Sequence, residues 1–108
     1  MLRGDPIRGH VDSMILGALQ GGPTHGYGLV LRLRDLSDGA FELKEGTLYP
    51  ALHRLEEAGK LESTRSRDSG RERRVYALTP LGEAALREER AAWTTFARGM
   101  RGVLGGSG

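Results

Sequence analysis

The chain has 108 residues, no cysteine and a formal net charge of +2 at pH 7. Without cysteine it has no disulfide, no thiolate nucleophile and no zinc or iron–sulfur site built on thiolates. Its longest apolar stretch, MILGAL at 14–19, is far below the roughly 20 residues that cross a bilayer, so we expect one small cytoplasmic domain. A domain of this size buries a limited core and would gain stability from contact with a second copy.

Two helices are predicted in the first 40 residues. The first ends at the Gly-Gly-Pro of 21–23, and its apolar residues at helical spacing are Val11, Met14, Ile15, Ala18 and Leu19. The second begins at Thr24 or His25, is weakened by early glycines, and ends at the Ser-Asp-Gly of 37–39. The residues that it turns inward are Leu29, Val30, Leu33 and Leu36. Residues 41–43 are then expected to form a very short strand.

A third helix is predicted within EGTLYPALHRLEEAG at 45–59, which has a proline near its start. If Thr47 is the N-cap, Pro50 is the third helical residue, where its missing N–H breaks no helical hydrogen bond. Gly59 supplies the C-terminal cap. The inner face consists of Leu48, Ala51, Leu52 and Leu55, and the outer face of Tyr49, Pro50, His53 and Arg54. Its stiff, uncrowded N-terminal end is suited to entering a groove.

Alternating residues follow Gly59 and predict a β-hairpin with its turn at Asp68-Ser69-Gly70. Residues 60–76 contain six basic and three acidic residues, so the basic excess is concentrated here. The hairpin arginines are Arg65, Arg67, Arg71, Arg73 and Arg74. Such a segment is typical of a surface that binds a polyanion, and a solvated arginine-rich hairpin has the same pattern.

Thr79-Pro80 predicts the N-cap and first residue of a last helix that runs to about Val103. Its apolar stripe has heptad-like spacing interrupted only by Glu89, and consists of Leu86, Trp93, Phe96, Met100 and Val103. The order of elements predicts a mainly α fold with a small β-hairpin. We expect a winged helix-turn-helix DNA-binding domain at 1–79, a long C-terminal dimerisation helix at 80–104 and a flexible tail at 105–108. In such a domain the third helix enters the major groove and the hairpin follows the neighbouring backbone.

Three segments, GGPTHGYGLVLRL, EGTLYPALHRLEEAGKLES and GRERRVYALTPLGEAAL, resemble the PadR family of bacterial transcriptional regulators. The resemblance covers residues 11–104, and its most specific parts are HGY at 25–27, GTLYPALHRLE at 46–56 and YALTPLG at 76–82. The single C-terminal helix is similar to that of the short subfamily. The element order and this resemblance together lead us to expect a homodimeric repressor. It would bind a pseudo-palindromic double-stranded DNA operator and be released by a small-molecule or other effector.

The resemblance also implies roles for residues at matching positions. Those in or beside the major groove are Lys44, Thr47, Tyr49 and Pro50. Those near phosphates are Tyr27 and Arg32 in the second helix and Arg73 and Arg74 in the hairpin. Gly28 departs from the family, in which a larger residue is usual at this position, and we expect it to loosen the second helix.

Three residues on the outer face of the third helix have different expected roles. Tyr49 either reads DNA or packs under the hairpin. His53 lies one turn further along the helix, where its side chain either reaches the bases or stops short of them. Arg54 is the expected phosphate partner, because its planar guanidinium makes two charge-assisted hydrogen bonds.

In the short PadR subfamily the last helix and the first helix form the dimer interface. The residues that this implies for the interface are Val11, Ile15, Leu86, Trp93, Phe96, Met100 and Val103. Trp93 has two interpretations. It is either an apolar residue of the two-fold interface or, together with Phe96, a contact for a flat apolar or aromatic effector in a cavity between the subunits.

No residue pattern predicts an enzyme or a cofactor. His10, His25 and His53 lie on three separate segments, without a paired nucleophile and base, a phosphate-binding glycine loop or HExxH spacing. His10 and Asp12 are metal-ligating types, but residues two apart do not share a helix face. Two alternatives to the DNA-binding repressor stay open, a winged-helix protein-interaction module and a metal-responsive regulator.

Overall fold

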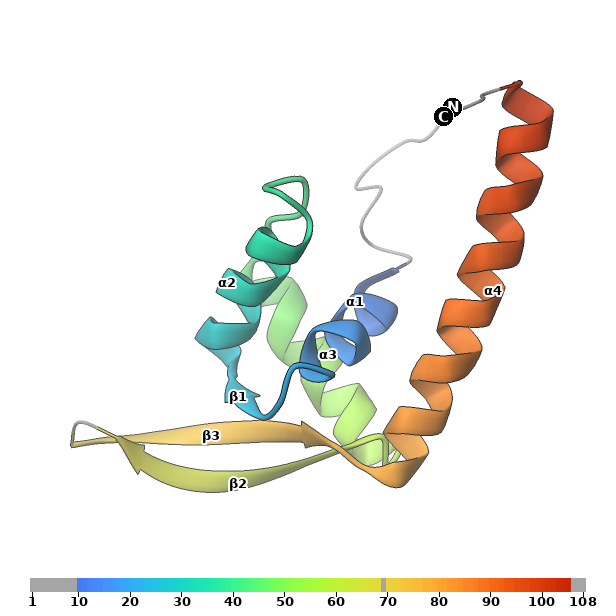
Figure 1. Cartoon of the computed structure of the whole chain (residues 1–108). Helices are drawn as coiled ribbons and strands as arrows, with labels where there is room; N and C mark the ends of the chain where they lie inside the picture. The colour runs from blue at the N-terminus through green and yellow to red at the C-terminus, as the bar shows by residue number, and fades with distance from the viewer. Residues whose placement is uncertain (1–9, 69, 106–108) are drawn as a thin grey trace.

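The computed structural model of the chain describes residues 10–68 and 70–105. In chain order these ranges form α1 (Val11–Leu19), β1 (Thr24–His25), α2 (Gly26–Leu36), α3 (Glu45–Glu57), β2 (Leu61–Asp68), β3 (Arg71–Leu78) and α4 (Pro80–Leu104). The strands form one antiparallel sheet in the order β1-β3-β2. The β2-β3 hairpin extends to one side of the helices, and α4 rises from its other end (Figure 1). The predicted mainly helical winged helix-turn-helix fold is confirmed.

The hydrophobic core lies between α1, α2, α3 and the base of the hairpin. Its largest fully buried side chains are Ile15, Leu16, Leu29, Leu48 and Leu52. The predicted inner face of α3 is confirmed, because all four of its apolar residues are buried. The predicted inward position of Leu36 is wrong. This side chain is 69% exposed, because it is the last residue of α2, where the chain turns away from the helix.

The third strand of the sheet comes from a different segment than the sequence predicts. Residues 41–43 form no strand and instead belong to the loop between α2 and α3, from which Leu43 enters the core. Thr24 and His25 form β1, which pairs with β3 opposite Tyr76 and Val75. The second helix consequently begins at Gly26, because its two expected first residues are used in the sheet.

α3 begins earlier than the sequence predicts, so the assignment of Thr47 as its N-cap is wrong. Lys44 is the N-cap, and its carbonyl oxygen accepts the N–H groups of Thr47 at 3.0 Å and Leu48 at 2.9 Å. Pro50 is therefore the sixth helical residue, and its ring removes the N–H that would otherwise bind the carbonyl of Gly46. The C-terminal cap by Gly59 is confirmed by its positive φ of 78° and by the Lys60 N–H bond to the Leu55 carbonyl.

The hairpin has the predicted turn position, with Asp68 paired to Arg71; Ser69 lies outside the described residues. Because side chains alternate across a strand, its arginines lie on two faces. Paired residues of neighbouring strands lie on the same face, and Ser63 pairs with Tyr76. Every second residue from this pair shares that face, so the face of the buried Tyr76 carries Arg65, Arg67 and Arg74. The opposite face carries Arg71 and Arg73. All five arginines were expected to meet phosphates, and this register assigns them to two separate surfaces.

α4 begins as predicted, with the Thr79 hydroxyl accepting the Gly82 N–H at 3.0 Å and Pro80 as the first helical residue. A Cβ atom on Gly82 would collide with the carbonyl oxygen of Lys60, so the helix start is fitted closely against the connection between α3 and β2. Gly105 ends the helix with a φ of 73°, and residues 106–108 of the predicted tail lie outside the described residues. In the ranges that the structure describes, no helix is long and apolar enough to cross a membrane.

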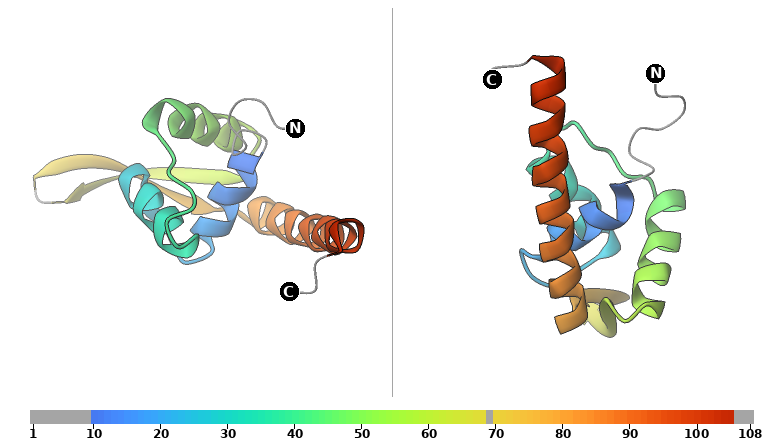
Figure 2. Two further views of the ribbon diagram at one scale, coloured as in Figure 1. Left: turned by 90° about the horizontal axis from the view of Figure 1, so that it is seen from above. Right: turned by 90° about the vertical axis from the view of Figure 1, so that its right-hand side faces the viewer.

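Most of α4 projects away from the core (Figures 1 and 2). Only Gly82 and Leu86 are buried in this helix. The radius of gyration of 15.3 Å exceeds the value of about 13 Å that is typical of a compact domain of this length. The chain is therefore elongated, and the far half of α4 has little protein around it.

Candidate nucleic-acid interface

The outward face of α3 carries most of the side chains that the sequence predicts for DNA recognition. Lys44, Thr47, Tyr49, Pro50 and His53 are all exposed. His53 has its Nε2 atom 3.6 Å from the Glu57 carboxylate, one turn along the same helix. The buried leucines on the inner face hold the helix against the core, so the exposed residues lie on a rigid element.

Tyr49 was expected either to read DNA or to pack under the hairpin, and its position has features of both. Its side chain is 46% exposed, and its ring lies against Gly26 at the start of α2. A Cβ atom on Gly26 would lie 2.7 Å from the Tyr49 hydroxyl oxygen and 3.0 Å from the ring. The glycine of the HGY segment is therefore required by the tyrosine that packs against it, and the ring keeps one exposed side.

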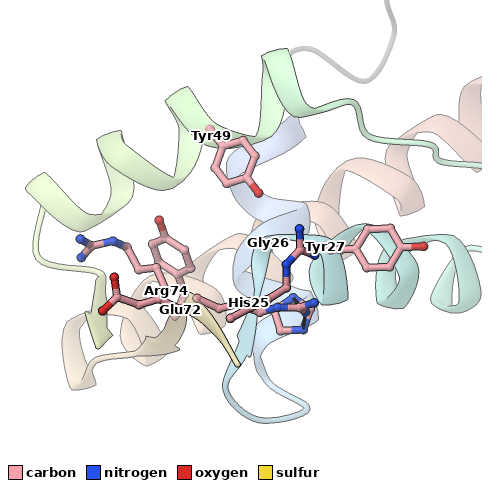
Figure 3. A pocket seen from close by; sticks show the side chains of 9 residues that line it. His25, Gly26, Tyr27, Tyr49, Glu72 and Arg74 are labelled. Carbon is pink, nitrogen blue, oxygen red and sulfur yellow. Dashed lines mark hydrogen bonds between the residues drawn. The ribbon is translucent and has the colours of Figure 1, made fainter. Parts of the chain in front are cut away.

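A pocket of about 590 Å³ lies between the start of α2, the outer side of α3 and β3 (Figure 3). Its lining residues are His25, Gly26, Tyr27, Tyr49, Arg71, Glu72, Arg73, Arg74 and Tyr76. Three arginines face one glutamate, so the pocket is electropositive. The α2 N-terminus adds partial positive charge to it. This arrangement suits a phosphate group more than an apolar ligand.

Two of the hairpin arginines are held by side chains of the protein itself. Arg73 Nη1 lies 2.7 Å from Nε2 of His25, which is half-buried. Arg74 Nη1 donates to the Ser63 hydroxyl at 2.9 Å, and that hydroxyl donates to the Glu56 carboxylate at 2.6 Å. These contacts fix the base of the hairpin against α2 and α3.

The other hairpin arginines lie nearer the turn of the hairpin, and all are exposed. Arg65 has its Nη1 atom 3.9 Å from the Glu72 carboxylate, and both side chains are mostly exposed. Arg67 and Arg71 are exposed as well. An exposed ion pair of this length contributes little to stability, so these arginines are available to a polyanion.

Tyr76 is a buried tyrosine among the residues that line the pocket. Burial raises the pKa of the Tyr76 hydroxyl, the nearby Glu56 carboxylate raises it further, and Arg74 opposes the shift. The phenol therefore stays protonated at neutral pH and keeps its O–H as a donor.

Two arginines that were expected to meet phosphates have partners within the fold. Arg32 Nη1 donates to the carbonyl oxygens of Ala18 at 2.9 Å and Gly22 at 2.8 Å, where it caps the end of α1. Arg32 therefore has a structural role, and its expected phosphate contact stays a prediction for the donors other than Nη1. Arg54 Nη2 donates to the Asp12 carboxylate at 2.7 Å and links α3 to α1. A phosphate contact by Arg54 would require that ion pair to open.

The predicted dimer residues divide into a buried and an exposed group. Val11, Ile15 and Leu86 are 3%, 0% and 8% exposed within the single chain, so they belong to its own core and have little surface left for a partner. Trp93 and Phe96 are 54% and 56% exposed, and the same face of α4 carries the exposed Met100, Val103 and Leu104. We call these five residues of α4 the seam.

The seam begins at an apolar pocket of about 480 Å³ between α1, the α2-α3 loop and α4. Its aromatic residues are Phe41, Trp93 and Phe96, with the Trp93 and Phe96 ring centroids 5.5 Å apart. His10 meets Trp93 edge-on at 5.9 Å. On the polar wall the Ser13 hydroxyl donates to the Glu89 carboxylate at 2.7 Å.

The sequence does not predict that His25 caps α2 and contacts Arg73 in this interface. Its Nδ1 atom accepts the Gly28 N–H at 3.1 Å and caps α2, while Nε2 faces Arg73. Histidine is not among the usual N-cap residues, and Arg73 is 48 positions away in the chain. Within the two described ranges, no group of three or more His, Asp or Glu side chains lies close enough together to hold a metal ion.

The comparisons with known proteins agree with this architecture. Residues 15–88 match the model of the transcriptional regulator PadR-like family. The chain is 49% identical over 73 residues to the transcriptional regulator Rv3488 of Mycobacterium tuberculosis, a match that covers 68% of this chain and 65% of that protein. The chain therefore spans slightly less than two thirds of that relative's length.

Two solved structures are similar over nearly their whole length. A transcriptional regulator from Clostridium thermocellum has 32% identity and a TM-score of 0.81, with 91% of this chain and 96% of the other covered. A PadR family transcription regulator from Clostridium difficile has 31% identity and a TM-score of 0.79, with 88% and 98% covered. The chain belongs to the PadR-like family of DNA-binding transcriptional regulators.

Proposed function

We propose that this regulator is a repressor that binds a pseudo-palindromic operator as a homodimer. The observation that carries the proposal is the shared pocket beside α3, where an exposed face of that helix meets the basic base of the hairpin (Figure 3). In a winged helix the third helix reads base edges, while the hairpin contacts the backbone. Lys44, Thr47, Tyr49 and Pro50 are the readout residues in this proposal, and the hairpin arginines are the phosphate contacts.

The seam of α4 supports the homodimer. Its large apolar side chains lie in a continuous row on a helix that projects from the core, and an exposed row of this kind marks a surface that another protein covers. A second copy presents the same row, so a two-fold pairing of α4 helices buries both at once. The pairing would place two α3 helices near one helical turn of DNA apart, about 34 Å, or a small multiple of it.

The apolar pocket at the start of the seam supports binding of an effector. Phe41, Trp93 and Phe96 offer aromatic surface for stacking on a flat compound. Because the pocket adjoins the seam, a ligand there would act on the spacing of the two protomers. In this proposal the effector releases the operator by changing the distance between the two α3 helices.

Footprinting on the DNA upstream of the protein's own gene is the first test of operator binding. A Thr47→Ala, Tyr49→Ala variant then separates readout from folding. We expect this variant to stay a folded dimer and to lose discrimination between operator and unrelated DNA. Neither side chain is buried in the core, so its circular dichroism spectrum should match that of the wild type. Full discrimination by the variant would contradict the proposed orientation of α3.

A further inference from the structure

Two residues in the first half of α3 are poor helix formers, and both are exposed. They are Gly46 and Pro50. Glycine destabilises a helix relative to alanine, because it loses more conformational freedom on folding, and proline removes a helical hydrogen bond. A Cβ atom on Gly46 would meet no atom within 4 Å, so packing within the chain does not require a glycine here. The two residues weaken the helix without a compensating contact inside the fold.

Both residues lie on the side of α3 that faces away from the core. Residues four apart are neighbours on one helix face, so Gly46 and Pro50 form a short row. With about 3.6 residues per turn, the buried Leu48, Leu52 and Leu55 lie on the opposite side. The start of the outer face consequently has no side chain at Gly46 and only a compact ring at Pro50. At this point the backbone of α3 can come close to a partner.

Pro50 also changes what the backbone offers at this point. Because proline has no N–H, the carbonyl oxygen of Gly46 lacks the helical donor that would come from four residues later. The carbonyl of Lys44, by contrast, accepts the N–H groups of Thr47 and Leu48. Carbonyl groups on the solvent side of a helix tilt outward, and Gly46 has no side chain to cover its own. α3 therefore presents a backbone acceptor on its outer face.

We propose that the Gly46 carbonyl oxygen accepts a hydrogen bond from the amino group of a cytosine or an adenine in the major groove. The inference rests on the proposed entry of α3 into that groove. Each base pair carries one such amino group there, and its place differs between the pairs, so an acceptor fixed in space selects among them. Facing the oxygen of guanine or thymine, the carbonyl would meet another acceptor and be repelled.

The rigidity of this group makes it a strong selector. Thr47 and Tyr49 lie on either side of the row formed by Gly46 and Pro50, and their side chains can change rotamer to suit a different base. A helical carbonyl cannot turn away from a wrong base. The mismatch would leave two facing acceptors without donors, which is a repulsive element against unrelated sequences.

Gly46→Ala separates DNA reading from folding, because alanine favours the helix while its methyl group blocks close approach. We expect its urea midpoint to equal or exceed that of the wild type. By fluorescence anisotropy, its affinity for a duplex that the wild type selects from a random pool should fall about tenfold, the effect of one unmade hydrogen bond. Its affinity for an unrelated duplex should change little, since phosphate contacts remain. Gly102→Ala, the same substitution in open space on α4, should change neither affinity.

Pro50→Ala tests the oxygen itself, because alanine restores the N–H that binds the Gly46 carbonyl. Selection from the random pool should show one base pair in each half-site that the wild type specifies and Pro50→Ala does not. At that pair, purine in place of adenine, or pyrimidinone in place of cytosine, removes the amino group and shows which base is read. We expect this change in the DNA to weaken wild-type binding about tenfold and to leave Pro50→Ala binding nearly unchanged.

Three results would overturn the inference. They are full discrimination by Gly46→Ala, a urea midpoint of Gly46→Ala below that of the wild type, and a Pro50→Ala consensus identical to the wild-type consensus. Each of them leaves the proposed function intact, because the wild type still reads its operator. A wild type that selects no consensus from the pool refutes the proposed function, and this inference with it.

Discussion

Replacing Arg73 and Arg74 with alanine tests the hairpin as a phosphate-binding element. The two side chains lie on opposite faces of β3, and each is held at the base of the hairpin by a hydrogen-bonding partner, His25 or Ser63. If each arginine meets one phosphate in a two-fold complex, the double variant loses two contacts per protomer. The two-fold complex thus loses four phosphate contacts. The slope of log affinity against log salt concentration becomes shallower by about 0.9 for each contact, so the expected total change is about 3.6.

The assay is fluorescence anisotropy with operator and unrelated duplexes at several salt concentrations. Affinity should fall for both duplexes, because phosphate contacts carry no sequence information. Arg98→Ala with Arg101→Ala is the matched control, since it removes the same charge from exposed positions on α4. The control should keep the wild-type slope. Unchanged affinity and slope in the hairpin variant would exclude both arginines from phosphate contact. If the slope falls, the two single variants show which face of the hairpin contributes.

Three further predictions concern stability and the effector pocket. Gly82→Ala should lower the free energy of unfolding, measured by urea denaturation, by about 1 to 3 kcal/mol or more, because the added Cβ meets the Lys60 backbone. Gly102→Ala is the control, since open space surrounds Gly102 and the substitution should not destabilise the fold. Leu52→Ala should cost about 2 to 5 kcal/mol by the same measurement, since the fully buried side chain leaves a cavity, and a smaller loss would place Leu52 outside the core. Trp93→Ala should preserve the dimer in sedimentation while flat aromatic compounds lose affinity in calorimetry; unchanged binding of such compounds would exclude Trp93 from their site.

Local patterns in the sequence were enough to predict the helices and, apart from Leu36, the inner faces of α1, α2 and α3. The leucines of α3 and the Thr79-Pro80 start of α4 could be read from spacing and capping chemistry, because each depends on residues within a turn or two. The hairpin was predictable for the same reason. Its turn and its alternating residues lie next to each other in the chain.

Contacts between distant segments were not predictable in this way. β1 has only two residues and no strand pattern of its own, and it exists because β3 offers a free edge. The partners of Arg32 and Arg54 within the fold, the end of α1 and Asp12, cannot be seen in their local sequence. The contact between His25 and Arg73 was missed for the same reason.

In the proposed mechanism, DNA recognition depends on a dimer formed through the far half of α4. A chain that ends after Arg90 keeps the buried Gly82 and Leu86 and loses the whole seam. Analytical ultracentrifugation and operator binding, measured on the same samples, show whether the dimer and DNA recognition are lost together. We predict a full-length dimer that binds its operator, and a truncated chain that is monomeric or aggregated and binds no operator specifically. A truncated chain that stays monodisperse and binds the operator with full affinity would show that DNA recognition does not need the seam.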